Sequence, residues 1–325
     1  MTENGGPGGP IGHGFPHLAT VRASITALFR RLSADGTDGT EGAEGIHAYG
    51  TSITPADAAF DATDDLHLGA QRVAAATVRA LRLPDARMVV SFRAMEEAAT
   101  VELAAGPEYF VEVNDRFRTH RRDLAAALSH EVAHVLLHRL DLRFPGTAEN
   151  EILTDTAAAY LGAGWLLLDA YREDALTHQH FGYLTPEEFG YVLAKRAALF
   201  GEDPAPWFTS HRAYEAYVRG RALAERDHRR APLAAAGPLA RRRYARARRT
   251  GAAGSAGVAG AAGGAGGAGG AGGDASAYRF EQDGSGGGLR VSFPCPVCAQ
   301  WLRVPVRGRL RARCGLCHSV LDCLT

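Results

Sequence analysis

Apolar residues recur at helical spacing along most of the first 230 residues of the chain. The clearest run covers 124–140, where no Gly or Pro interrupts the segment and the apolar positions lie mostly three or four residues apart. The residues that set this spacing are Leu124, Leu128, Val132, Val135 and Leu136. Similar patterns predict further helices over 17–32, 71–83, 150–162, 185–200 and 211–230. The pattern therefore predicts a mainly helical domain.

Three short segments depart from the helical pattern and favour β-strands. They are 87–92, 100–104 and 109–114, and the last two alternate between apolar and polar positions. All three precede the 124–140 helix, so we expect a small sheet ahead of it. The predicted fold class is α+β.

Changes in composition mark the domain boundaries. Residues 1–16 are rich in Gly and Pro, and we expect them to be disordered. A large globular domain is predicted over 17–230, a linker over 231–288 that is first basic and then rich in Gly and Ala, and a small module over 289–325. Gly recurs at every third position over 251–272, but a collagen-like helix needs abundant proline, which is absent there, so we expect a flexible linker.

A histidine motif lies within the 124–140 helix. His130 and His134 are four residues apart, so their imidazoles lie one above the other on one helix face and can reach a single metal ion. Glu131 follows the first histidine and can accept a proton from a metal-bound water. This HExxH pattern indicates a zinc-dependent peptidase.

The next predicted helix supplies two carboxylates at helical spacing. Glu151 follows His134 after 16 residues, and Asp155 lies one turn later on the same face. Catalytic zinc usually takes three protein ligands, and two histidines with one glutamate are a common set, so Glu151 is the predicted third ligand. Asp155 is predicted to accept the free ring N–H of a ligating histidine. The alternative is an exposed acidic helix start, because carboxylates also favour the first turn.

Together these motifs resemble the zincin-like metallopeptidases of the gluzincin type, in which HExxH is followed on the next helix by an ExxxD motif. The resemblance covers about residues 87–200. It implies a peptidase in which His130, His134 and Glu151 bind the zinc ion and Glu131 is the general base.

The resemblance also implies a fold. A mixed sheet precedes the active-site helix, and the 109–114 strand would be the edge that pairs with an extended peptide substrate. We therefore expect a zincin-like, mostly helical metallopeptidase domain with a small mixed sheet. Leu137 and Leu140 occupy the Gly and third His positions of the extended HExxHxxGxxH motif, which excludes that branch of the family.

The expected reaction needs a donor for the tetrahedral oxyanion. Zinc lowers the pKa of its bound water to about 7, the glutamate takes the proton, and the hydroxide attacks the scissile carbonyl. In the families that the chain resembles, a His or Tyr from a later helix or loop then stabilises the oxyanion. The candidates, each of which has a structural alternative, are His178, His180, Tyr183 and His211. The donor stays unassigned.

The C-terminal end carries a second metal-binding pattern. Cys295 and Cys298 form one CxxC pair, Cys314 and Cys317 form another, and 15 residues separate the pairs. This spacing predicts a structural zinc site in which four thiolates bind one tetrahedral ion.

Two strand-like segments, 301–305 and 309–313, lie between the cysteine pairs and flank a turn. They predict the hairpin of a zinc ribbon, a module of about 35 residues whose small core makes it depend on metal for folding. The residues 314–318 also satisfy the CxxCH pattern of haem attachment, but the upstream CxxC favours the ribbon. Cys323 remains and is interpreted as a small apolar residue.

Cysteine usage and hydropathy restrict the compartment. All five cysteines fall in the last 31 residues, so the larger domain is not a disulfide-stapled secreted domain. The start of the chain lacks the apolar core of a signal peptide, and no apolar run reaches the length of about 18 residues that a membrane span needs. We expect a cytoplasmic protein with no membrane contact.

The zero net charge of the chain hides an asymmetry. Residues 1–218 carry 18 Lys and Arg against 30 Asp and Glu, whereas 219–325 carry 18 against 6. Eleven of these arginines lie within 219–249. This basic stretch and the ribbon are candidates to bind nucleic acid or an acidic protein, to dock on the acidic domain of the same chain, or simply to be solvated.

Two functions follow from these patterns. The first is a zinc endopeptidase whose basic stretch and ribbon recruit a peptide or protein substrate or a partner. The second is a non-catalytic regulatory protein that binds nucleic acid or protein and whose zincin domain has lost activity. The intact Glu131 favours the first, because metal retention alone does not need a general base.

Overall fold

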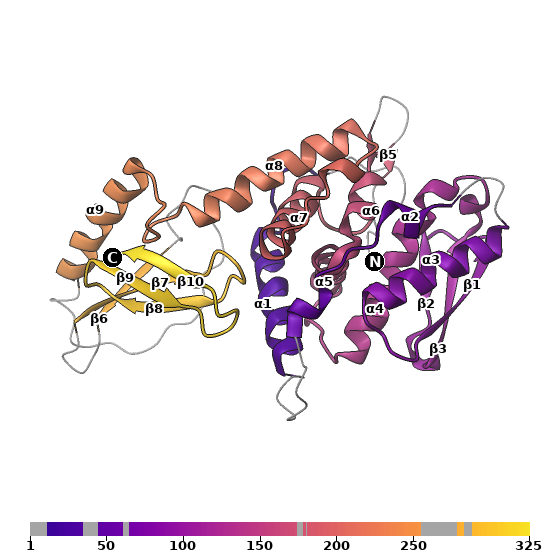
Figure 1. The fold of residues 1–325 in the computed structure, drawn as a ribbon, viewed down its shortest axis with the longest axis horizontal. Helices are drawn as coiled ribbons and strands as arrows, with labels where there is room; N and C mark the ends of the chain where they lie inside the picture. The colour runs from indigo at the N-terminus through magenta and orange to yellow at the C-terminus, as the bar shows by residue number, and fades with distance from the viewer. Residues whose placement is uncertain are drawn as a thin grey trace. The chain divides into compact units, whose positions relative to one another are not determined.

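We describe a computed structural model of the chain over residues 12–34, 45–60, 65–173, 178–179, 181–254, 278–282 and 288–325. The chain forms two compact units, residues 1–223 and 224–325, whose elements are labelled in Figure 1. Helices outweigh small sheets in the described residues, so the structure is mixed α and β, as predicted at that level.

The longer elements of the first unit are α1 (Leu18–Ala34), α2 (Pro55–Ala58), α3 (Leu66–Ala80), β1 (Arg87–Arg93), β2 (Ala99–Val101), β3 (Glu108–Asn114), α4 (Leu124–Arg139), α5 (Thr147–Ala158), α6 (Gly164–Asp169), β4 (Arg172–Glu173), β5 (His178–Gln179), α7 (Pro186–Phe200) and α8 (His211–His228). Its 3-10 segments are η1 (Gly45–Tyr49), η2 (Leu103–Ala105), η3 (Asp115–Arg118), η4 (Arg121–Asp123) and η6 (Ala205–Trp207), and η5 (Ala159–Ala163) is a π-helical segment.

A small mixed sheet lies ahead of α4 in the chain, with the strand order β1-β3-β2. β1 runs parallel to β3 and β2 runs antiparallel to it. The expectation that 109–114 is an edge strand is wrong, because β3 is paired on both sides. Burial alternates along β3, because Val111 and Val113 are buried and Phe110 is 46% exposed. This alternation shows that one face of the strand is buried, but it occurs in central and outer strands alike. The outer strand that packs beside α4 is β2.

The helix α4 is the centre of the first unit. Its residues are buried around most of the circumference, and α3, α5 and α6 pack against it. Alanines at 125, 126, 127 and 133 add small apolar positions to the Leu and Val positions, and a helix that is apolar nearly all round belongs in a core. The histidine motif is therefore fixed on a rigid, buried element.

The ends of two helices show why the chain folds this way locally. At the start of α7, Thr185 Oγ1 accepts the N–H of Glu188 at 3.1 Å, and the Glu188 carboxylate accepts the N–H of Thr185 at 3.1 Å. This capping box, with Pro186 in the first turn, confirms the predicted helix start. Between α5 and α6, Gly162 has φ +120°, and a Cβ there would lie 2.9 Å from Ser52 Cα, so the bend requires glycine.

The second unit contains α9 (Pro238–Gly254), β6 (Arg279–Gln282), β7 (Leu289–Pro294), β8 (Trp301–Pro305), β9 (Arg309–Arg313) and β10 (Val320–Leu324). β6, β7 and β8 form an antiparallel sheet, and β9 pairs with β10. The predicted hairpin between 301–305 and 309–313 is wrong, because β8 pairs with β7 and β9 pairs with β10. Each CxxC reverses the chain, so each strand pairs with the strand across its own cysteine turn.

Part of the segment predicted to be a linker has defined structure in the second unit. Leu233 bridges to Cys323 of β10, and Leu324 N donates to Pro232 O at 2.7 Å. Tyr244 of α9 contacts the rings of Tyr278 and Phe280, with centroids 5.0 and 5.3 Å away. Pro232, Leu233 and Tyr244 therefore pack with the strands of the second unit.

Within the described ranges, no helix is both long enough and apolar enough to cross a membrane.

Candidate metal centres

Two neighbouring helices bring three of the predicted ligands together. His130 and His134 lie one turn apart on α4, and Glu151 lies on α5. The Nε2 atoms of the two histidines are 3.1 Å apart, and Glu151 Oε2 lies 3.3 Å from the first and 3.5 Å from the second. One ligand atom from each residue lies within 4.8 Å of the other two, which is a donor set that one metal ion can use. We call this group the His–Glu cluster.

The electrostatics of the His–Glu cluster favour a cation. Burial lowers the pKa of His130, but hydrogen bonds to Asp155 and Glu151 outweigh burial and raise this pKa well above its ordinary value. Burial raises the pKa of Glu151, but the two histidines outweigh it, so this pKa is lowered. The Glu151 carboxylate therefore stays ionised, and positive charge at the cluster is stabilised. A divalent metal ion bound by neutral imidazoles would satisfy the same negative field.

Asp155 orients the first histidine. Its side chain is fully buried, and Oδ1 lies 2.9 Å from His130 Nδ1. An ionised carboxylate only accepts, so the histidine donates from Nδ1 and its neutral form presents the Nε2 lone pair to the cluster. Asp155 Oδ2 also accepts the backbone N–H groups of Tyr183, at 2.5 Å, and Leu184, at 3.1 Å.

A glycine allows the 182–184 loop to approach Asp155. Gly182 has φ +79°, and a Cβ at this position would lie 2.2 Å from both carboxylate oxygens of Asp155. Any side chain here would both strain the backbone and collide with the buried carboxylate.

Thr154 orients the second histidine. Its hydroxyl donates to the backbone oxygen of Asn150 at 3.0 Å, so its oxygen accepts from His134 Nδ1, which lies 3.3 Å away. This places the proton on Nδ1 and leaves Nε2 of His134 free to bind metal. Both histidines therefore have the tautomer that a shared ion requires.

Glu131 is a buried carboxylate beside the cluster, with a relative exposure of 6%. Burial raises its pKa, and the nearby His130 and His134 offset this shift only in part. Glu131 is not one of the three converging ligand groups.

The candidates for the oxyanion donor are placed differently. The backbone N–H of Tyr183 donates to Asp155, and burial, followed by the charges of Glu151 and Asp155, raises the pKa of its phenol. The His211 side chain is 82% exposed and lies 3.3 Å from Glu215 on the next turn of α8, so it has a surface partner of its own. His178 lies on β5, but its side chain is outside the described part of the structure, as is the whole of His180.

The four predicted cysteine ligands form a second cluster. Cys295 Sγ lies 3.6 Å from Cys317 Sγ, and Cys298 Sγ lies 3.6 Å from Cys314 Sγ. All four sulfurs lie within 4.8 Å of one another. This group, which we call the four-cysteine cluster, can bind a metal ion such as zinc, as its spacing predicted.

The two halves of the four-cysteine cluster have the same local geometry. After each pair, a residue with positive φ closes the turn: Ala299 at +60° and His318 at +59°. The backbone N–H groups of these residues donate to Cys295 O at 3.0 Å and to Cys314 O at 3.1 Å. His318 therefore belongs to a turn between β9 and β10. The clustering of both pairs favours the four-thiolate site over haem attachment, for which only one CxxCH is needed.

Cys323 is separate from this site. It is fully buried on β10, and burial raises the pKa of its thiol to about 11. The residue therefore packs as a protonated apolar side chain, in agreement with its sequence interpretation.

Two contacts of the His–Glu cluster were missed by sequence reasoning. Thr154 carries a weak signal, because it lies three residues after Glu151, which is close to one helical turn. The backbone N–H groups of residues 183 and 184 carry no residue-type signal, although the glycine at 182 marks a turn.

Comparisons with known proteins do not add to this picture. No protein-family model matches the chain, and no match was found among curated proteins or among solved structures. The candidate sites therefore rest on the residues and the geometry of this chain.

Proposed function

We propose that this protein is a zinc-dependent metallopeptidase of the zincin-like, gluzincin type. The single observation that supports this most is the convergence of His130, His134 and Glu151, whose ligand atoms lie within 4.8 Å of one another. Their order in the chain, HExxH followed by ExxxD, is the order that the resemblance implies.

The donor set fits a catalytic zinc ion. Two imidazoles with free Nε2 atoms and one carboxylate supply three ligands, which leaves a position for water or substrate. When bound, zinc supplies Lewis acidity, by which it lowers the pKa of a water ligand and polarises a carbonyl group. The Asp155 and Thr154 contacts would hold the two rings in the orientation that this binding requires.

Glu131 is the proposed general base. It follows His130 on a buried helix, so its carboxylate is held beside the cluster and away from bulk solvent. In the proposed reaction it accepts the proton of the attacking water and passes it to the leaving amine.

The surroundings suggest how a substrate is held. β2 is an outer strand beside α4, and an extended peptide can pair with a strand of this kind. Tyr183 is the proposed oxyanion donor, because its backbone N–H donates to Asp155 beside the cluster and its raised phenol pKa keeps the proton that a donor needs.

The four-cysteine cluster is proposed to hold a structural zinc ion in a zinc-ribbon module. Four thiolates close the coordination of a tetrahedral ion, so this site has no position for a substrate. Its expected role is to stabilise the fold of the second unit.

The decisive experiment replaces Glu131 with Gln in the full-length chain. We expect two zinc ions per chain in both proteins, while cleavage of a mixed peptide library falls by at least about 100-fold in the variant, as expected for loss of a general base. Glu149→Gln is the matched control, because this glutamate is exposed on the same helix as Glu151 and should leave cleavage unchanged.

Two outcomes would contradict the proposal. Full activity in Glu131→Gln would show that this carboxylate is not the base. A wild-type protein that carries zinc at the His–Glu cluster but cleaves nothing in the library would favour the non-catalytic regulatory function.

A further inference from the structure

The second unit carries an excess of positive charge. Residues 224–325 contain 16 Arg and 6 Asp or Glu, which gives a net charge of +10, whereas residues 1–223 contain 20 Lys or Arg and 30 Asp or Glu, a net of −10. A net positive charge of this size on about 100 residues makes the arginine-rich surfaces of the second unit candidates for binding an anionic partner.

The helix α9 is fixed in the second unit by one aromatic side chain. Tyr244 is buried against Tyr278 and Phe280, while the arginines on the rest of the helix are exposed. The exposed arginines of α9 are Arg241, Arg242, Arg243, Arg246, Arg248 and Arg249. The helix therefore presents its arginines from a defined position.

The register of the β6-β7-β8 sheet shows which side chains lie on each of its two faces. Phe280, Val291 and Val304 lie side by side on the face that Tyr244 covers. Successive side chains of a strand point to opposite faces, so Arg279 and Arg303 lie on the other face. The arginines of α9 and those of this sheet are thus on different sides of the sheet.

A row of arginines is exposed on β9. Arg309, Arg311 and Arg313 are exposed at alternate positions, so they share one face of β9. Arg309 lies opposite Leu324 of β10, and Leu324 lines a pocket together with residues of α9. The row therefore begins at the rim of this pocket.

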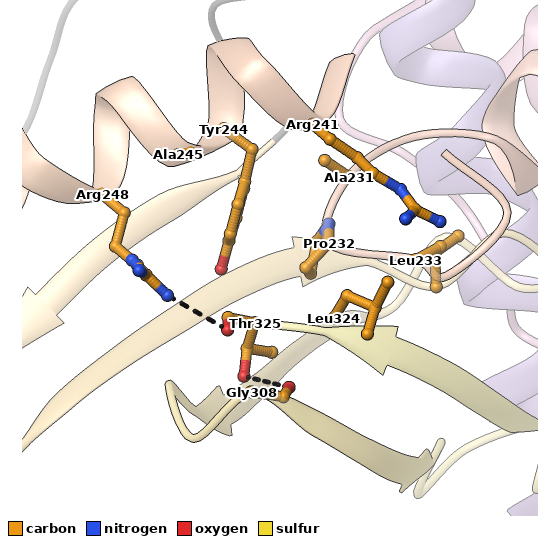
Figure 2. A pocket seen from close by; sticks show the side chains of 10 residues that line it. All are labelled: Ala231, Pro232, Leu233, Arg241, Tyr244, Ala245, Arg248, Gly308, Leu324 and Thr325. Carbon is orange, nitrogen blue, oxygen red and sulfur yellow. Dashed lines mark hydrogen bonds between the residues drawn. The ribbon is translucent and has the colours of Figure 1, made fainter. Parts of the chain in front are cut away.

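The pocket lies between α9 and the segment that leads into β9. It has a volume of about 250 Å³, and Arg241 and Arg248 line it from α9, while Gly308 lines it from the segment that leads into β9. Figure 2 shows the Arg248 side chain pointing from the helix towards Thr325, and the Arg241 side chain pointing towards the segment of Ala231, Pro232 and Leu233. Arg248 Nη1 donates to the backbone oxygen of Thr325 at 3.3 Å, and Arg241 Nε donates to Ala236 O at 2.8 Å. These contacts fix the two guanidinium groups at the pocket.

Most of the positive charge in the β9 row is uncompensated. Within the described residues, Arg309 and Arg313 have no hydrogen bond or ion pair through their side chains, and Arg311 has one distant partner, Asp322, at 3.8 Å. By contrast, Arg303 on the opposite face is paired with Glu281 at 3.2 Å. Three arginines and one acidic side chain, Asp322, therefore share this face of the β9–β10 pair.

We propose that the exposed β9 arginine row, Arg309, Arg311 and Arg313, binds the phosphates of a single-stranded nucleic acid. Alternate residues of a strand lie about 6.8 Å apart, a spacing comparable to that of neighbouring phosphates in an extended strand. A polymer with one negative charge on every repeat suits such a row better than a protein surface of mixed charge does. Guanidinium groups also match the geometry of phosphate oxygens.

The test measures binding of the full-length, zinc-loaded protein to a fluorescein-labelled single strand of about 20 nucleotides by fluorescence anisotropy. The binding variant is Arg309→Gln, Arg311→Gln and Arg313→Gln together. Each lost phosphate contact lowers the slope of log affinity against log salt by about 0.7, so the slope should fall by about 2. Between about 50 and 200 mM salt, the wild type should therefore lose about 15-fold more affinity than the variant does.

The matched control removes three arginines from the opposite face of the β6-β7-β8 sheet of the same unit. The control variant combines Arg279→Gln, Arg290→Gln and Arg303→Gln, so it changes the net charge by the same amount. Arg290 pairs with Glu281 across the strands, which places it on the same face as Arg279 and Arg303. We expect this control to keep the wild-type salt slope. Zinc content and thermal melting of both variants check that the unit is folded.

Several results would overturn the proposal. Equal losses in the two triple variants would show a general charge effect without a binding face. Equally tight binding of a polyglutamate of matched length would assign the surface to acidic protein. Tighter binding of the duplex than of the single strand, or the absence of binding at about 50 mM salt, would also exclude a single-stranded ligand. DNA and RNA strands run in parallel identify which backbone is preferred.

Discussion

Replacement of Asp155 by Asn tests how the buried carboxylate controls the zinc site. Asp155 accepts from His130 Nδ1 and from the N–H groups of Tyr183 and Leu184, and its side chain is fully buried. An Asn side chain keeps one acceptor oxygen and replaces the other with an N–H2 donor. In either orientation, the new donor faces another donor.

Both orientations carry a cost that can be worked out from these contacts. If the amide nitrogen faces His130, the histidine must shift its proton to Nε2, which removes the lone pair needed for zinc. If the nitrogen faces the 183–184 loop, two buried N–H groups lose their acceptor, at about 1–3 kcal/mol for each unsatisfied group. Loss of a contact that orients a metal ligand weakens metal affinity by about 10–100-fold, which corresponds to about 1.4–2.7 kcal/mol.

The assay combines chelator competition with urea unfolding of the metal-free protein. We expect the Asp155→Asn variant to release zinc from the His–Glu cluster at a roughly 10–100-fold lower chelator concentration, while the four-cysteine cluster keeps its ion. The matched control is Asp169→Asn. Asp169 is also a buried carboxylate, and it accepts from Thr209 N, Thr209 Oγ1 and Ser210 N at 2.6–2.9 Å. This control should lose stability without losing zinc affinity.

The reasoning is refuted if Asp155→Asn binds zinc as tightly as the wild type while it remains folded. An equal loss of zinc affinity in Asp169→Asn would also refute it, because the effect would then reflect general destabilisation of the first unit.

Three further expectations follow from the described contacts. Gly182→Ala should destabilise the first unit by at least about 1–2 kcal/mol in urea unfolding, since its Cβ would meet the Asp155 carboxylate at a left-handed backbone position; an unchanged midpoint would contradict the close approach of the loop. Cys295→Ser with Cys298→Ser should lower zinc from two ions to one per chain by elemental analysis and leave peptide cleavage intact, and retention of two ions would contradict the assignment of the four-cysteine cluster. Cys323 should resist alkylation at pH 8 in the folded protein, because its thiol pKa of about 11 lies above that pH and little thiolate is present. Alkylation should become fast as the pH rises through 11 or when the protein unfolds. Rapid labelling of the folded protein at pH 8 would contradict the burial of this residue.

Local sequence features were enough to identify the ligand candidates and several elements. The i, i+4 spacing of His130 and His134 places them on one face of any helix, and the apolar run around them makes that helix a core element. The CxxC spacing likewise brings two sulfurs together within one turn. The capping box at Thr185 and Glu188 marks a helix start for the same reason, since its hydrogen bonds close within three residues.

The predictions from sequence were wrong where the partner of a strand or helix lies far away in the chain. The alternation of Tyr109, Val111 and Val113 reports one buried face of β3 but not its neighbours in the sheet. The sequence order of β8 and β9 suggested a hairpin, yet each strand is captured by the partner across its own cysteine turn. The basic segment near Tyr244 looked like linker, because the aromatic residues that bind it follow more than 30 residues later in the chain.

The amino-acid sequence by itself determined which side chains can bind zinc and which of them share a helical turn, because those relations depend on backbone geometry over a few residues. The tertiary structure alone decided that Asp155 and Thr154 contact the two histidines, that the 182–184 loop reaches the buried carboxylate, and that Tyr244 of α9 packs on Tyr278 and Phe280. These contacts join segments whose spacing along the chain carries no periodic signal, so they are fixed only when the cores of the two units pack.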